Sequence, residues 1–277
     1  MRIAILMMGM VLLAGHDQAT FADLPLRTES FDSDPGWTSV GNGLNGNTFG
    51  YQGQSALAGG TLGEAGGVFT RSDFNRLFAD TDLGGVITLD QPFEARGKFD
   101  FTARNRPDFG QPVWMGHFGL EGGGFAAGNK VGLFFSNGAQ QSELSWGLGM
   151  RLIGQSDAET QQVVIAPNID REWSYSWDPF AGVHGAGRLT GSLSGPGGGT
   201  KFVDLLPDQR ILGVQLDAFG LAGHFPSPSN PNSSFFATMY LDDVSYSVVP
   251  EPATVSLLAI GMLGMLWAVR RGRTRAR

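Results

Sequence analysis

The chain has 277 residues, no cysteine and a formal net charge of −7 at pH 7. The acidic balance excludes the basic footprint that nucleic-acid binding requires, so we expect no nucleic-acid partner. Without cysteine no disulfide can stabilise an exported domain, which must rely on its core. The 42 glycines and 20 phenylalanines favour many strands joined by tight turns, and hence an all-β protein.

Residues 1–22 have the pattern of a secretory signal peptide. Arg2 supplies a positive charge, Ile3 to Ala14 form an apolar run, and Thr20-Phe21-Ala22 places small residues before a cut. We expect signal peptidase to cleave after Ala22. The alternative is an N-terminal membrane anchor, for which a helix with this run is short.

Residues 23–248 contain short apolar or alternating runs separated by Gly, Pro, Asn and Asp. This spacing predicts one domain, a single antiparallel β-sandwich of the jelly-roll type. Only the segment Asp73 to Ala79 is expected to form a short helical turn. The runs expected as strands are Gly97–Ala103, Val113–Leu120, Val131–Phe135, Leu144–Leu152, Gln161–Ala166, Glu172–Trp177, Gly187–Leu193, Phe202–Leu205, Ile211–Phe219 and Phe235–Val248.

Two pairs of segments resemble known sandwich folds. Trp173-Ser-Tyr-Ser-Trp-Asp-Pro followed by residues 185–195 resembles the strand–turn–strand hairpin of concanavalin A/laminin-G-like jelly rolls. The phrases Glu29-Ser-Phe-Asp-Ser-Asp-Pro-Gly-Trp and Tyr240-Leu-Asp-Asp-Val-Ser-Tyr resemble the first and last strands of carbohydrate-binding-module jelly rolls. The resemblance implies that the two ends of the domain pair in one sheet. Folds of this kind host lectins, enzymes, adhesins and spacers alike.

The C-terminal segment, residues 249–277, has three parts in a characteristic order. Pro250-Glu251-Pro252 interrupts regular structure, and Ala253–Val269 is an uncharged run of 17 residues, near the lower limit for a transmembrane helix. A basic tail follows, which would hold this end in the cytoplasm. Its arginines are Arg270, Arg271, Arg273, Arg275 and Arg277.

This order resembles the PEP-CTERM sorting signal of Gram-negative bacteria. The resemblance implies export, anchoring in the inner membrane during transit, processing by an exosortase, and delivery to the cell surface or extracellular matrix. It also implies that the mature protein lacks the membrane helix and the arginine tail. The alternative is an ordinary C-terminal anchor with a proline-containing linker.

The sequence offers no recognisable catalytic residues, which predicts a protein that is not an enzyme. Jelly-roll glycosidases align their acids as Glu-x-Asp-x-x-Glu, and no such triplet is present. Glu121, Glu143 and Glu172 are isolated in sequence, although folding could bring two of them together. The histidines are scattered, and His117, in an apolar strand, is expected to be a hydrogen-bonded core or cleft residue.

Calcium is the one ion for which ligands can be named. Asp32 and Asp34 near the first strand could meet Asp242 and Asp243 near the last, and calcium prefers such carboxylate oxygens. The jelly-roll resemblance implies the same, with a carboxylate of the Leu-Asp-Asp-Val strand as ligand. The alternative is that Asp32 and Asp34 cap a turn while Asp242 and Asp243 face solvent or bond to backbone. No other cofactor is required.

These observations lead to a functional expectation. We expect an exported surface or extracellular-matrix protein, associated with exopolysaccharide or biofilm, whose body is a structural or adhesive module. The alternative is a lectin-like module that binds extracellular polysaccharide, and a glycoside hydrolase is a third choice. Trp146 is expected in the core, whereas Trp37, which follows a turn, is the tryptophan expected to stack on a ligand.

Overall fold

The computed structural model describes most of the domain that lies between the two sorting segments. The described residues are 23–40, 49–70, 75–104, 112–120, 128–137, 144–210, 213–224 and 236–250. The predicted signal peptide and the predicted transmembrane run lie outside them. Within these ranges the regular structure is β-strand plus one 3-10 turn, η2 (Val183–Gly185), and no helix has the length and apolar character needed to cross a bilayer.

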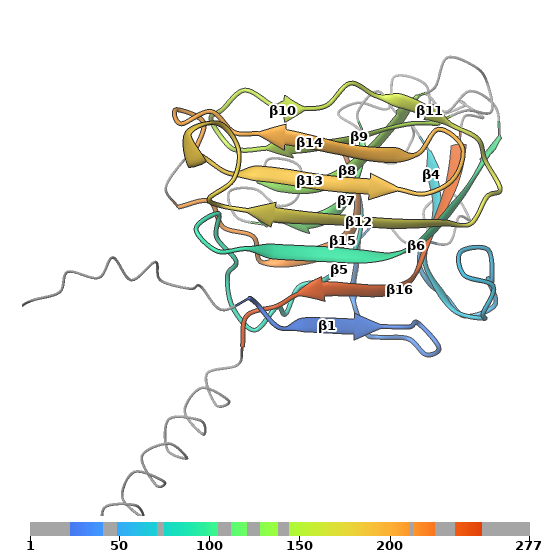
Figure 1. Cartoon of the computed structure of the whole chain (residues 1–277). Coiled ribbons are helices and arrows are strands. Elements are labelled where there is room, and N and C mark those ends of the chain that lie inside the picture. The colour runs from blue at the N-terminus through green and yellow to red at the C-terminus, as the bar shows by residue number, and fades with distance from the viewer. Residues whose placement is uncertain are drawn as a thin grey trace, which may run out of the picture.

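The strands form two antiparallel sheets packed face to face, which confirms the predicted β-sandwich (Figure 1). In sheet A the order is β14-β13-β12-β6-β16-β4-β3, with β1 paired to the other part of β16. The bounds in sheet A are β14 (Gly199–Asp204), β13 (Arg188–Leu193), β12 (Arg171–Asp178), β6 (Phe93–Arg104), β16 (Phe236–Ser247), β4 (Glu64–Thr70), β3 (Phe49–Gln52) and β1 (Leu26–Glu29).

Sheet B has the order β10-β9-β8-β7-β15-β5-β2, with β11 also paired to β9. In each sheet several neighbouring strands are distant in sequence, such as β12 and β6 in sheet A and β7 and β15 in sheet B, because the chain crosses repeatedly between the two layers. The bounds in sheet B are β10 (Ala158–Glu159), β9 (Leu144–Arg151), β8 (Lys130–Asn137), β7 (Val113–Phe118), β15 (Ala218–His224), β5 (Asn75–Asp80), β2 (Thr38–Val40) and β11 (Val163–Ile165).

The two ends of the domain lie side by side, as predicted. β1 pairs antiparallel with the last part of β16, from Leu26 opposite Ser247 to Glu29 opposite Val244. The predicted hairpin is also present, with β12 paired to β13 and Trp173 opposite Leu193. In Figure 1, β1, β16, β6, β12, β13 and β14 follow one another across sheet A.

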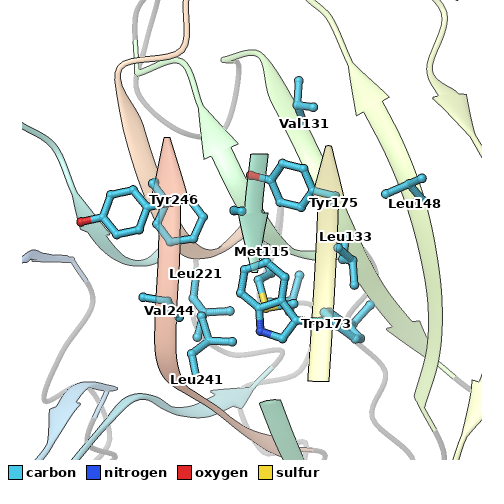
Figure 2. Close-up of a cluster of buried hydrophobic side chains, with 14 of the residues drawn as sticks. Met115, Val131, Leu133, Leu148, Trp173, Tyr175, Leu221, Leu241, Val244 and Tyr246 are labelled. Carbon is cyan, nitrogen blue, oxygen red and sulfur yellow. The ribbon is translucent and has the colours of Figure 1, made fainter. Parts of the chain in front are cut away.

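The core lies between the sheets and is rich in aromatic rings. In Figure 2, Trp173 and Tyr175 of β12 and Tyr246 of β16 point into the interior, toward side chains of sheet B such as Met115. Tyr246 stacks on Phe219 with ring centroids 4.1 Å apart. Trp146 is fully buried, as predicted. Alternation along β12 therefore places its aromatic residues inward and its serines outward.

Sheet B is apolar on its outer face as well. Every residue of β7 is buried, and a second cluster of buried apolar side chains occupies the outer side. Its members are Leu77, Ala79, Trp114, Phe118, Phe134, Ala218 and Ala222. Burial on both faces explains why Val113–Phe118 is a continuous apolar run and not an alternating one. The open polar face of the described sandwich is therefore the outer face of sheet A.

Two element predictions were wrong. Most of the segment expected as a helical turn forms strand β5, because pairing with β15 and β2 gives its backbone groups partners in the sheet. The strand expected over Ile211–Phe219 begins only at Ala218, and before it Leu216 forms an isolated bridge with Ile87. Strands β2, β3 and β4, which are short or rich in glycine, were not predicted from the sequence.

Candidate functional site

The outer face of sheet A is built by strict alternation. In β12, Trp173, Tyr175 and Trp177 are buried, whereas Glu172 and Ser176 between and beside them are exposed. Strands β6, β13 and β14 continue this face on either side of β12. Because paired residues of neighbouring strands point to the same side of a sheet, the register assigns the outward residues to rows that cross the strands.

One row, here called the central row, consists of Arg96, Ser174, Ser192 and Thr200. Arg96 lies opposite Ser174, Ser174 opposite Ser192, and Ser192 opposite Thr200. The Ser174 and Ser192 hydroxyl oxygens are 2.8 Å apart and share a hydrogen bond. Four strands thus present one guanidinium and three hydroxyl groups in a line at the spacing of the strands.

A row of mixed chemistry flanks the central row on each side. On one side lie Glu94, Ser176, Thr190 and Phe202, in register on the same four strands. Phe202 is 59% exposed, and the Arg188 guanidinium carbon lies 4.6 Å from the centre of its ring. On the other side Lys98 lies opposite Glu172, whose backbone N–H donates to the Ser194 hydroxyl at 2.7 Å.

This face is hollowed along the central row. A hollow of about 510 Å³ reaches from Lys98 and Asp243 to Thr200, and a second of about 400 Å³ adjoins it toward Glu94. Both are lined by all members of the central row, Arg96, Ser174, Ser192 and Thr200. The central row is therefore the floor that the two hollows share.

The charges of the groove differ in how they are neutralised. Lys98 Nζ lies 2.5 Å from Asp243 Oδ2, and this hydrogen bond raises the pKa of Lys98. Among the described residues, Arg96 and Glu172 take part in no ion pair. They keep one positive and one negative group available to a ligand, in addition to hydroxyls that both donate and accept.

The four aspartates predicted to bind calcium are in different environments. Asp32 accepts a hydrogen bond from the Ser30 hydroxyl at 2.9 Å, and Asp34 accepts one from the Gly36 N–H at 2.9 Å. Asp243 pairs with Lys98, as described above. Asp242 is fully buried and accepts hydrogen bonds from the Thr61 hydroxyl at 3.0 Å and the Asp243 N–H at 2.8 Å.

A second buried acid, which the sequence analysis did not single out, lies near Asp242. Glu64 is fully buried, and its Oε1 accepts a hydrogen bond from the Ala58 N–H. Burial raises the pKa of Glu64 and of Asp242. The Asp242 carboxylate adds to the rise at Glu64, and the Asp243 carboxylate adds to the rise at Asp242. In the described part of the chain no three His, Cys, Asp or Glu side chains are grouped to hold a metal. Calcium stays a prediction.

Trp37 is packed by other rings. It is partly buried against the core and contacts Phe31, Phe78, Phe219 and Tyr246 with ring centroids 5.1 to 6.2 Å apart. Its role in ligand stacking stays a prediction. Phe202, in the flanking row, is an exposed aromatic ring beside the groove.

His117 is a hydrogen-bonded core residue, as predicted. It is fully buried, and burial lowers its pKa to about 4, so the ring is neutral at pH 7. Nε2 lies 3.2 Å from the Ser247 carbonyl oxygen and must carry the proton, because a carbonyl only accepts. Nδ1 therefore accepts the hydrogen bond of the Tyr175 hydroxyl at 2.6 Å. Both nitrogens are occupied structurally.

Comparison with known proteins identifies the sorting segment. The model of the PEP-CTERM protein-sorting motif matches residues 248–271. The chain therefore carries this motif, which marks an exported, membrane-transiting exosortase substrate sorted to the cell surface. Pro250, Glu251, Pro252, Arg270 and Arg271 lie inside the match, whereas the last three arginines lie beyond it. No curated protein matches the chain.

Several solved structures are similar in outline. A protein of unknown function from Shewanella oneidensis MR-1 has 12% identity and a TM-score of 0.47, covering 82% of this chain and 87% of that one. Alginate lyase Aly36B has 11% identity and a TM-score of 0.45, covering 83% and 100%. The Emp47p carbohydrate recognition domain has 8% identity and a TM-score of 0.37, covering 81% and 89%. At these identities the likeness says nothing about which side chains form a site.

Proposed function

We propose that the body of this exported protein is a jelly-roll module that binds a carbohydrate polymer on the outer face of β6, β12, β13 and β14. Through this contact it acts as an adhesive component of extracellular material. The observation that carries the proposal is the central row, which lines both hollows of this face with one guanidinium and three hydroxyl groups.

The chemistry of the groove suits a sugar chain. Sugars present hydroxyl groups that donate and accept, and serine and threonine hydroxyls do the same. Arg96 and Glu172 add charge-assisted hydrogen bonds, which are stronger than neutral ones. Exposed Phe202 offers an apolar ring at the rim. An open face that crosses four strands suits an extended polymer better than a small molecule, which is usually enclosed in a pocket.

The proposed module binds the polymer without cleaving it. The two glutamates of the groove, Glu94 and Glu172, belong to the two flanking rows, whose backbones are about 13 Å apart along the strands. Paired glycosidase carboxyl groups lie roughly 5 to 9.5 Å apart. The remaining parts of the proposal are secretion with cleavage by signal peptidase, association with exopolysaccharide or biofilm, and a structural calcium ion.

The proposal is tested by a polysaccharide-binding panel, including neutral and acidic glycans, with two matched variants. Ser192→Leu places a bulky side chain on the floor of the groove, whereas Ser245→Leu alters a similar half-buried serine of sheet A outside it. We expect Ser192→Leu to weaken binding about tenfold or more, equivalent to about 1.4 kcal/mol, and Ser245→Leu to leave it unchanged. Equal affinities in the two variants, or no binding by the native protein, would overturn the proposal.

A further inference from the structure

A third hollow continues the groove toward the N-terminal end of the domain. Its volume is about 350 Å³, which lies within the range of about 300–1,000 Å³ that small-ligand sites occupy. It shares Glu94 and Ser176 with the second hollow, just as the second hollow shares the central row with the first. The three hollows therefore form one path along β6 and β12.

The walls of the third hollow are aliphatic where they are open to solvent. Leu26 is 38% exposed, although its position in β1 is on the outer face of sheet A. Leu24 and Pro92 also line the hollow and are half-buried. The rings of Phe93 and Trp177 lie at its base and are at most 3% exposed. A ligand in this hollow therefore meets aliphatic side chains, which gain free energy when an apolar group covers them.

The polar groups of the third hollow favour a ligand without negative charge. The carboxylates of Asp23 and Glu94 line it, and neither takes part in an ion pair among the described residues. If signal peptidase cleaves after Ala22, the new α-ammonium group joins Asp23, and the hollow still holds one carboxylate more than cations. The two acids therefore repel a carboxylate or sulfate substituent. The exposed Ser176 hydroxyl can donate a hydrogen bond to an uncharged acceptor.

We propose that the third hollow binds an acetyl group carried by the sugar chain that lies in the groove, so that the ligand is an acetylated polysaccharide. This inference rests on the proposed function. The acetyl methyl group packs against Leu24, Leu26 and Pro92, and its carbonyl oxygen accepts the hydrogen bond of the Ser176 hydroxyl. An acetyl ester or amide is uncharged, so the two carboxylates do not repel it. A bare sugar hydroxyl leaves the aliphatic walls facing a polar group, and the polymer without acetyl groups binds more weakly.

Two matched pairs of glycans test the proposal on the purified exported protein. The first pair is the polysaccharide that binds most tightly in the panel above, in a chemically O-acetylated form and in a form deacetylated with alkali. The second pair is chitohexaose and cellohexaose, which are both neutral and differ in the acetamido group of each sugar. We expect the acetylated member of at least one pair to bind about fourfold or more tightly, as the burial of one methyl group predicts. The pair that shows this preference identifies the linkage as ester or amide.

Two leucine variants locate the acetyl group. Leu26→Ser removes an aliphatic wall and should abolish the preference by lowering the affinity for the acetylated form. Leu57→Ser, at another exposed leucine that lines none of the three hollows, should keep the preference.

The failures of the two proposals can be told apart. Equal affinities within both pairs, with the polysaccharide still bound, would overturn the acetyl site and leave the proposed function standing. A preference that persists in Leu26→Ser would also overturn it, because the acetyl group would then bind elsewhere. Absence of binding to every glycan would refute the proposed function and the acetyl site together.

Discussion

On the outer face of sheet A, strands β6, β12, β13 and β14 leave Arg96 and Glu172 open to solvent, whereas β4 and β16 bury Glu64 and Asp242. Alternation along the strands points all four side chains outward. The difference comes from the loop before β4, in which Thr61 and the Ala58 backbone bond to the two buried acids. Strand alternation sets the direction of a side chain, and the covering loop decides whether its charge stays in water.

The outer face of sheet A thus has an open half (β6, β12, β13 and β14) and a half that a loop covers (β4 and β16), and we expect the two halves to have different roles. A buried carboxylate loses hydration, so its pKa rises, and its charge becomes a cost unless a proton or a cation compensates it. The open half bears no such cost and keeps its hydroxyls and charges available to a ligand. The covered half is therefore suited to stability and the open half to binding.

The largest expected effect is the difference in unfolding free energy between a variant of the core and a variant of the open face above it. Trp173→Ala removes a buried ring whose Nε1–H donates to the Lys98 carbonyl oxygen, and we expect it to reduce the free energy of unfolding by about 3–5 kcal/mol. Ser174→Ala, one residue on and facing outward, should change it by no more than about 0.5 kcal/mol. Urea unfolding measures both. Similar losses of unfolding free energy in the two variants would contradict the assignment of Trp173 to the core and Ser174 to the outer face.

The second effect concerns calcium in the covered half. If the ion binds only the folded state, the free energy of unfolding rises by about 2.7 kcal/mol at one hundred times the dissociation constant. Melting curves in millimolar calcium and in chelator should differ for the native protein and coincide for Asp242→Asn. Glu172→Gln, in the open half, is the control and should keep the shift. No shift in the native protein refutes the calcium prediction.

The smallest effect is a pH dependence that belongs to the covered half. The folded pKa of Glu64 is raised above its ordinary value of 4.5, so its contribution to stability is complete below that pH and is lost as pH rises through the folded pKa. In chelator, Glu64→Gln should therefore gain about 1 kcal/mol over the native protein at pH 7 and nothing at pH 4. Ser174→Ala, which removes no titratable group, is the control and should show no such difference. Thermal melts at the two pH values decide, and a Glu64→Gln protein less stable at pH 7 would contradict the assignment.

The local sequence pattern predicted much of the fold, because the alternation of apolar and polar residues within one strand shows which side chains face inward. The Trp-Ser-Tyr-Ser-Trp alternation of β12 needs no partner strand to show which residues face inward. The pairing of β1 with β16 followed from short phrases at the two ends of the domain. The segment that became β5 was misjudged because its extended form depends on pairing with β15, which lies far away in the chain.

The candidate site was less accessible to sequence reasoning. Ser174 could be assigned to an outward face, but the register that aligns it with Arg96 and Thr200 joins strands that are distant in sequence. The two adjacent aspartates could not be ranked either. Pairing along β16 shifts in register between Asp242 and Ser245, and Asp243 has a φ of 48° there, so one carboxylate is buried and the other reaches Lys98.

The sorting signal could be identified from sequence alone, because a linear order of prolines, apolar residues and arginines is read directly by membrane and protease. The alternation of β12 and the acidic, cysteine-free composition were determined in the same way. Tertiary structure alone decided which acids are covered and which hydroxyls line up across four strands. Those properties depend on loop placement and strand register, both of which are set by contacts between residues far apart in the chain.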